Sequence, residues 1–220
     1  MQIANIAEIC ACIISAFYYN KIKNSFLKWL PLYLLYVSAF EFFIHYTVPS
    51  PRINALIYFS ITMLSIIFYN NCFYKLFQHI KKIQNLIIIL SSLLFLAGFL
   101  LFFSAETFQR NSYYLLIVVG IEVSAIACIY LYNLFLSDDL QVLLIKQSGF
   151  WMSAGVLLFF SGICFTFAIS PIAIKYNLKI FDTYLVWFIP RTLSVILYSS
   201  LTVAVVLYKP KPKNNIEHGR

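Results

Sequence analysis

Apolar residues occupy this chain in long runs, which short polar segments separate. Each run is roughly 17 to 28 residues long, and an α-helix needs about 20 residues to cross a hydrocarbon layer about 30 Å thick. The runs lack the apolar–polar alternation of membrane β-strands, and only helices or closed barrels satisfy the backbone in lipid. The pattern therefore predicts an all-α, polytopic membrane helical bundle. Its seven transmembrane helices are expected over residues 3–19, 26–46, 53–74, 84–103, 112–136, 148–170 and 181–208.

Composition indicates the same class of protein. The chain is 62% apolar and 11% charged, with a mean hydropathy of +0.84, whereas soluble domains are about 45–50% apolar and about a quarter charged. We expect residues 1–208 to form one transmembrane domain and residues 209–220 to form a short basic cytoplasmic tail. The first run carries Glu8 and has no basic segment before it, which favours a first transmembrane helix over a signal peptide.

The loop lysines and arginines predict the orientation of the helices, because cytoplasmic loops carry an excess of these residues. Of sixteen basic residues, eleven fall on one predicted side of the membrane and four on the other. The basic side is expected to be cytoplasmic, which gives an N-out/C-in arrangement in the inner (cytoplasmic) membrane. The eleven are Lys21, Lys23, Lys28, Lys75, Lys81, Lys82, Lys146, Lys209, Lys211, Lys213 and Arg220, and the four are Arg52, Arg110, Lys175 and Lys179.

Five ionisable residues fall inside the predicted helices, where charge is costly and marks candidate functional sites. Counted inward at about 1.5 Å per residue, Glu8 and Glu41 lie roughly 8 Å from the outer surface. Glu41 and His45 are four residues apart and share one face of a helix. Glu122 and Arg191 share a depth of roughly 15 Å, so they would form an ion pair if their helices touch. The five residues predict an outward-facing polar cavity suited to protons, cations or amine-bearing ligands.

A purely structural role for these residues is the alternative. Glu8 and Glu41 are shallow enough to reach interfacial water, and a pair between Glu122 and Arg191 would simply fix helix packing. For Glu8 alone we favour the structural interpretation. Residues 70–72, with the sequence Asn-Asn-Cys, are expected to end the third helix at the membrane interface.

Other residues are assigned to helix geometry. Pro190 lies inside the last predicted helix and is expected to kink it. Pro171 is expected just past the sixth helix. Gly120, Ser124 and Cys128 recur every four residues and predict a packing stripe on the fifth helix, since small side chains let helices approach closely.

Motifs for several chemistries are missing from the sequence. A retinal protein needs a lysine in its last helix, and here the last helix has none before Lys209 at its cytoplasmic exit. There is no metalloprotease, serine-hydrolase or phosphate-loop motif, and the five cysteines lack metal-ligand spacing. We therefore expect no enzyme activity, no metal and no cofactor. An intramembrane enzyme with Glu41 and His45 as acid and base is an alternative that lacks any supporting motif.

Part of the chain resembles a known group of proteins. The segments FWMSAG, over residues 150–155, and LLFFSG, over residues 157–162, resemble uncharacterised bacterial seven-helix membrane proteins. Those proteins are similar to the membrane portions of sensory kinases, and Tyr130, Tyr132 and Tyr198 fit the same pattern. The resemblance implies a sensing or signalling module. The helix count also resembles sugar transporters of the three-plus-one-plus-three type, but their Pro-Gln motif is missing here.

These observations leave three functions open. The leading one is a sensor-like or receptor-like module that binds a small ligand or ion from outside and passes a change in helix packing to a cytoplasmic signalling partner or a second copy. The others are a small-solute or proton-coupled transporter and a structural membrane subunit. The net charge of +8 lies mainly in loops and tail, so it indicates contact with the lipid bilayer and not with nucleic acid.

Overall fold

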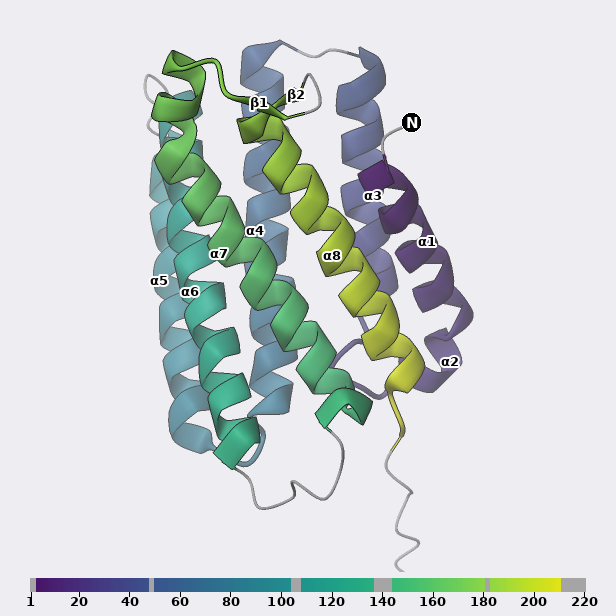
Figure 1. Ribbon diagram of the computed structural model, residues 1–220. Coiled ribbons are helices and arrows are strands. Elements are labelled where there is room, and N and C mark those ends of the chain that lie inside the picture. The colour runs from purple at the N-terminus through teal and green to yellow at the C-terminus, as the bar shows by residue number, and fades with distance from the viewer. Residues whose placement is uncertain (1–2, 48–49, 104–107, 137–143, 181–182, 211–220) are drawn as a thin grey trace, which may run out of the picture.

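The fold is a bundle of helices, seen in a computed structural model (Figure 1). The structure describes residues 3–47, 50–103, 108–136, 144–180 and 183–210. In chain order the elements are α1 (Ile3–Phe17), α2 (Tyr19–Ile22), α3 (Leu30–Thr47), α4 (Pro51–Leu76), α5 (Lys81–Phe103), α6 (Phe108–Leu136), the 3₁₀ turn η2 (Leu144–Lys146), α7 (Ser148–Lys175), β1 (Lys179–Ile180), β2 (Thr183–Tyr184) and α8 (Leu185–Leu207).

Five of these helices, α4 to α8, are long and apolar enough to cross a membrane, and α1 and α3 are apolar but shorter. The outer faces of the bundle are apolar as well. On α5, for example, Leu93 and Leu100 expose 57% and 62% of their surface. A surface of this kind belongs in lipid, because soluble proteins do not expose large contiguous apolar areas. The predictions of an all-helical fold and of a membrane-embedded protein are confirmed.

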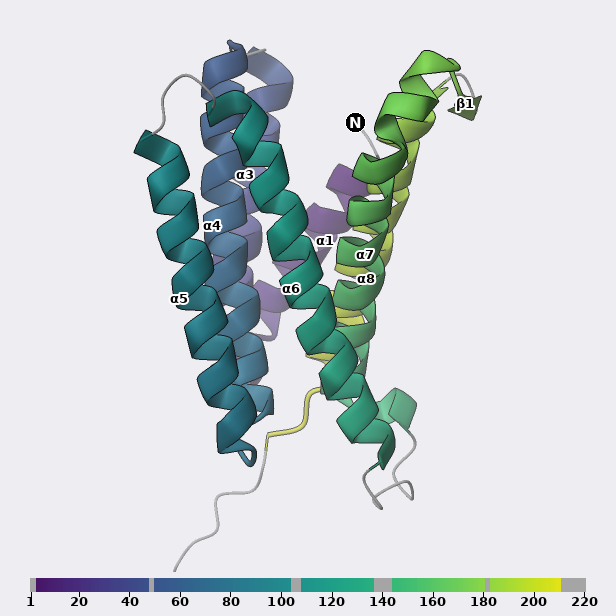
Figure 2. The same cartoon turned by 90° about the vertical axis from the view of Figure 1, so that its left-hand side faces the viewer.

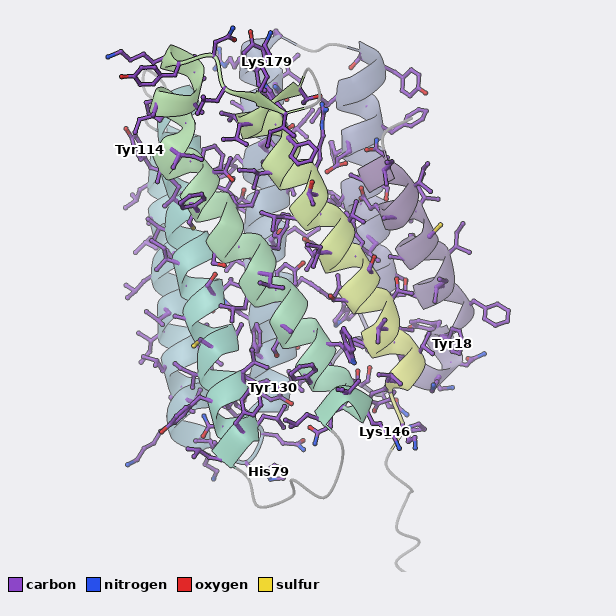
Figure 3. All side chains as sticks on the ribbon, in the orientation of Figure 1. Tyr18, His79, Tyr114, Tyr130, Lys146 and Lys179 are labelled. Carbon is purple, nitrogen blue, oxygen red and sulfur yellow. The ribbon has the colours of Figure 1, made fainter. Side chains whose placement is uncertain are left out.

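The helices pack in two groups that α6 connects. Figure 2 shows α4 and α5 on one side of the bundle and α7 and α8 on the other, with α6 running between them. α7 packs along both α8 and α6, while α6 also packs on α4. The short helix α1 packs against α8 and α3, so the beginning and the end of the described chain lie side by side. Figure 3 places Lys146 and His79 at one end of the bundle and Lys179 at the other.

Small residues allow the closest helix contacts. On α7, a Cβ atom at Gly155 would lie 2.6 Å from the Cβ of Ser200 on α8, so only glycine fits at this crossing. On α1, the buried face consists of Ala4, Glu8, Ala11 and Ser15, and its small side chains let α1 pack closely on its neighbours. A carboxyl group in such a face must be held by polar partners.

The packing stripe predicted on the fifth helix is correct only in part. Gly120 of α6 faces α7, where a Cβ atom would lie 2.8 Å from the sulfur of Cys164. The hydroxyl of Ser124 is buried as well. Cys128, however, is exposed and lies outside this contact. The four-residue spacing drifts around a helix with 3.6 residues per turn, so the third position turns away from the neighbouring helix.

The sixth predicted helix ends later than expected. α7 continues through Pro171 to Lys175, so placing Pro171 beyond the helix was wrong. Two residues past this end lies Asn177, whose φ angle of 51° is left-handed. The backbone N–H of Leu178 donates to the carbonyl of Ala173 at 2.9 Å, and that of Asn177 donates to Ile174 at 3.1 Å. These two bonds form a Schellman cap, which stops the helix without a proline.

A short hairpin replaces the start of the last predicted helix. β1 and β2 pair antiparallel, with Lys179 opposite Tyr184, and α8 begins only at Leu185. α8 is helical on both sides of Pro190, and the hydroxyl of Ser194 donates to the Pro190 carbonyl at 2.9 Å. A kink at Pro190 stays a prediction. Of the predicted basic tail, residues 211–220 lie outside the described part of the chain.

Candidate functional site

Of the five ionisable residues predicted to line one cavity, the four whose side chains the structure describes do not all meet at one place. Glu8 of α1 and Glu41 of α3 come together, while Glu122 of α6 bonds to a different helix. Arg191 of α8 is exposed, and the described structure shows no ion pair between Glu122 and Arg191, whose pairing was predicted only if their helices touch. The physical reason is that α7 packs between α6 and α8. The side chain of His45 lies outside the described residues.

The first site is a pair of carboxyl groups between α1 and α3. Glu8 is only 1% exposed, and its Oε1 accepts a hydrogen bond of 2.8 Å from the hydroxyl of Ser38 on α3. The carboxyl group of Glu41 lies within hydrogen-bonding reach of Glu8. Both glutamates line a small cavity of about 50 Å³, the space of one or two small ions or water molecules. Its lining consists of Asn5, Glu8, Ile9, Ser38, Glu41, Phe42 and Tyr46.

The chemistry of this pair follows from its geometry. Two carboxyl groups in direct contact cannot both remain ionised, so the pair either shares a proton or holds a small cation. Its titratable neighbours are two buried tyrosines, Tyr33 of α3 and Tyr198 of α8, together with the thiol of Cys12 one turn along α1. No lysine or arginine among the described residues forms an ion pair with either glutamate, so none of these basic side chains supplies a counter-charge to the pair.

Sequence reasoning missed Ser38 because a serine in an apolar helix carries no signal of its own. It becomes visible only when α1 is laid against α3, which brings residues 30 positions apart into contact. The tyrosines were missed for the same reason. Tyr33, for example, stacks on Phe68 of α4 with ring centroids 4.3 Å apart, and its hydroxyl bonds to Ser65 at 3.0 Å.

The second polar cluster lies among α4, α5 and α6. The amide nitrogen of Asn70 donates to the hydroxyl of Ser91 at 2.6 Å and to Oε1 of Glu122 at 3.0 Å. Asn70 and Glu122 are both buried, with 4% and 8% of their surfaces exposed. Asn70 was expected only to end its helix near the interface, but α4 continues beyond it to Leu76. Its role here is to bind a carboxylate on another helix.

The described residues contain no group of three or more histidine, cysteine, aspartate or glutamate side chains that could hold a metal ion. The five cysteines are unpaired thiols; Cys10 and Cys12 share α1, and the other three lie on α4, α6 and α7. The polar chemistry of the bundle therefore rests on its two carboxyl sites, one with Glu8 and Glu41 and one with Glu122.

Comparison with known protein families, with curated proteins and with solved structures finds no match to this chain. The resemblance of residues 150–155 and 157–162 to bacterial seven-helix proteins stays a prediction from the sequence. In the structure these segments form the first half of α7, where Gly155 contacts α8. Their small residues thus have a packing role that any helical bundle would need.

Proposed function

We propose that this protein is a multi-pass membrane sensor that responds to protons on the outer side of the membrane through the carboxyl pair of Glu8 and Glu41. The observation that carries the proposal is the contact of two carboxyl groups across a helix interface, inside a cavity too small for an organic solute. Such a pair is a proton-binding site whose occupancy changes the force between the two helices that carry it.

The proposal includes seven membrane crossings with N-out/C-in orientation. α1 and α2 together cover Ile3–Ile22, and 20 helical residues span about 30 Å, the thickness of the hydrocarbon core. Backbone bonds from Lys21 and Ile22 to the carbonyl of Tyr18 join the two helices. α3 contributes 18 residues, which is enough for one membrane crossing. Trp29 directly precedes α3 and would anchor this end of the crossing at the membrane interface. The excess of basic residues in the loops at the Lys146 end supports a cytoplasmic location for that end (Figure 3).

The direction of the response follows from charge. At low pH a proton lies between the two carboxyl groups and holds α1 against α3. As the pH rises this proton leaves, two negative charges face each other, and the contact between the helices is weakened. The contribution of the pair to stability is therefore present in acid and lost in alkali.

The position of α1 explains how this change would reach the cytoplasmic side. The face of α1 that carries Glu8 packs on α8, and Tyr198 of α8 lies near the pair. At the opposite end of the same interface, the Lys21 side chain donates to the carbonyl of Val206 at 2.6 Å. A shift of α1 would thus move the end of α8, where a signalling partner or a second copy could bind.

The test is a distance measurement between α1 and α3. The native Cys10 is exposed on α1 and Leu35 is exposed on α3. With the other four cysteines replaced, spin labels at Cys10 and at L35C report the helix separation in nanodiscs by pulsed electron paramagnetic resonance. We expect the mean distance to increase as the pH is raised. E8Q and E41Q should each remove the pH response and keep the short distance, because glutamine resembles a protonated glutamate.

R191Q is the matched control, because Arg191 belongs to the cavity predicted from sequence but not to the carboxyl pair of the structure. It should retain the full pH response. A response that persists in both E8Q and E41Q would contradict the proposal, and so would a distance that does not change with pH. Proton flux into liposomes that requires both glutamates would instead support the transporter alternative.

A further inference from the structure

A groove lies between α4 and α5. Its volume is about 630 Å³, within the range of about 300–1,000 Å³ that is typical of small-molecule sites. Its walls are apolar side chains such as Ile67, Ile88, Leu96 and Phe99. Since Ile67 and Leu96 are exposed, the groove opens on the lipid-facing surface. A ligand would enter it from the membrane.

The inner wall of this groove is polar and incompletely bonded. Asn70 and Ser91 line the groove, and Glu122 lies behind Asn70. The Asn70 amide nitrogen already donates two hydrogen bonds, but its oxygen Oδ1 has no partner, although it is buried. Oε2 of Glu122 is buried without a partner as well. Most buried polar atoms in proteins are bonded, so two orphan acceptors at one place indicate a missing donor.

We propose that this groove binds a lipophilic primary amine from the membrane, with its ammonium group donating to Asn70 Oδ1 and its apolar chain lying between α4 and α5. A primary ammonium has three donors, which suits a wall whose two unpartnered polar atoms, Asn70 Oδ1 and Glu122 Oε2, are both acceptors. Its charge complements the Glu122 carboxylate, which has no basic partner among the described residues. The proposal is independent of the proton-sensing pair, since it involves other helices and other residues.

Other lipid head groups fit this wall less well. A hydroxyl group carries a single donor and no charge, so it would satisfy one acceptor and leave the carboxylate uncompensated. A quaternary ammonium carries the charge but no donor. A phosphate or carboxylate head group would be repelled by Glu122.

Binding of radiolabelled dodecylamine to the full chain in phosphatidylcholine nanodiscs tests the proposal, with binding to empty nanodiscs subtracted. We expect saturable binding with one site per chain. Dodecylamine should compete at least tenfold better than dodecanol or dodecyltrimethylammonium. E122Q should weaken binding by about tenfold or more, because it removes the charge that faces the ammonium group.

A second pair of variants keeps the test decisive if E122Q does not fold. L96W places a large side chain in the groove, while L93W makes the same change at an exposed α5 position that does not line it. L96W should abolish saturable binding and L93W should retain it. The proposal is wrong if L96W binds dodecylamine as well as L93W does, or if dodecyltrimethylammonium competes equally with dodecylamine.

Discussion

Ser38 of α3 donates a hydrogen bond of 2.8 Å to the carboxyl group of Glu8 on α1, and this bond fixes the two helices at the point where their acidic side chains meet. Glu8 is 1% exposed, so the serine hydroxyl provides hydrogen bonding that water provides elsewhere. The sequence favoured a structural role for Glu8 in contact with interfacial water. Its burial beside Glu41 instead makes it the centre of the proposed proton site.

Replacing this serine should destabilise the bundle. We expect S38A to lower the free energy of unfolding by about 1–2 kcal/mol, because the buried Glu8 oxygen loses its donor. Reversible unfolding in mixed micelles measures the change. The control is S161A, since the exposed Ser161 hydroxyl bonds only to two carbonyls of its own helix, those of Leu157 and Leu158. Equal losses of unfolding free energy in S38A and S161A would show that the hydrogen bond from Ser38 to Glu8 stabilises the bundle no more than a hydrogen bond within one helix.

The crossing of α7 and α8 should tolerate no side chain at position 155. G155A places a Cβ atom 2.6 Å from the Ser200 Cβ, so the helices must separate, and we expect a loss of about 1–3 kcal/mol of unfolding free energy. The double variant G155A/S200G removes the opposing atom and should recover most of the loss. A double-mutant cycle measures this coupling, and simple additivity of the two losses would contradict the predicted contact.

A milder effect is expected at a second glycine of the same helix. At Gly162 the nearest atoms to an added Cβ belong to the end of the Leu193 side chain, at 2.4 Å. A flexible leucine can rotate away, whereas the Ser200 Cβ is fixed to its backbone. G162A should therefore destabilise less than G155A in the same unfolding experiment, and the reverse order would contradict this account.

The cap at the end of α7 predicts different effects of two substitutions at Asn177 on the unfolding free energy. The φ angle of 51° at Asn177 suits glycine best, asparagine next and alanine poorly. N177A should lower the unfolding free energy by about 1 kcal/mol, while N177G should leave it unchanged or raise it slightly. Thermal unfolding of both variants in detergent tests the cap. A loss in N177G as large as that in N177A would indicate that the asparagine side chain is what matters.

The orientation can be checked by labelling single cysteines from outside. In a variant without the five native cysteines, K179C should react with a membrane-impermeant maleimide in intact cells, because it lies at the proposed outer end. K146C, at the opposite end of the bundle (Figure 3), should react only after the membrane is opened. Labelling of K146C in intact cells would reverse the orientation proposed from the loop charges.

The sequence by itself determined the class of protein. Runs of apolar residues about as long as a bilayer is thick leave no choice but membrane helices, since the backbone has no other way to bond in lipid. The predicted helix over residues 53–74 became α4, from Pro51 to Leu76, and that over residues 84–103 became α5, from Lys81 to Phe103. Helix ends were less certain, as α7 shows by passing Pro171 and ending at Lys175, two residues before a left-handed asparagine.

The tertiary structure alone decided which residues meet. Hydropathy gives the depth of Glu122 and Arg191 in the membrane but not their direction around the helix axis or the order of the helices. With α7 packed between α6 and α8, these two residues are separated, and Glu122 finds Asn70 instead. The partnership of Glu8 with Glu41 and Ser38 likewise depends on how α1 packs on α3. Apolar burial is a property of each segment, whereas a polar site is a property of the interface between segments.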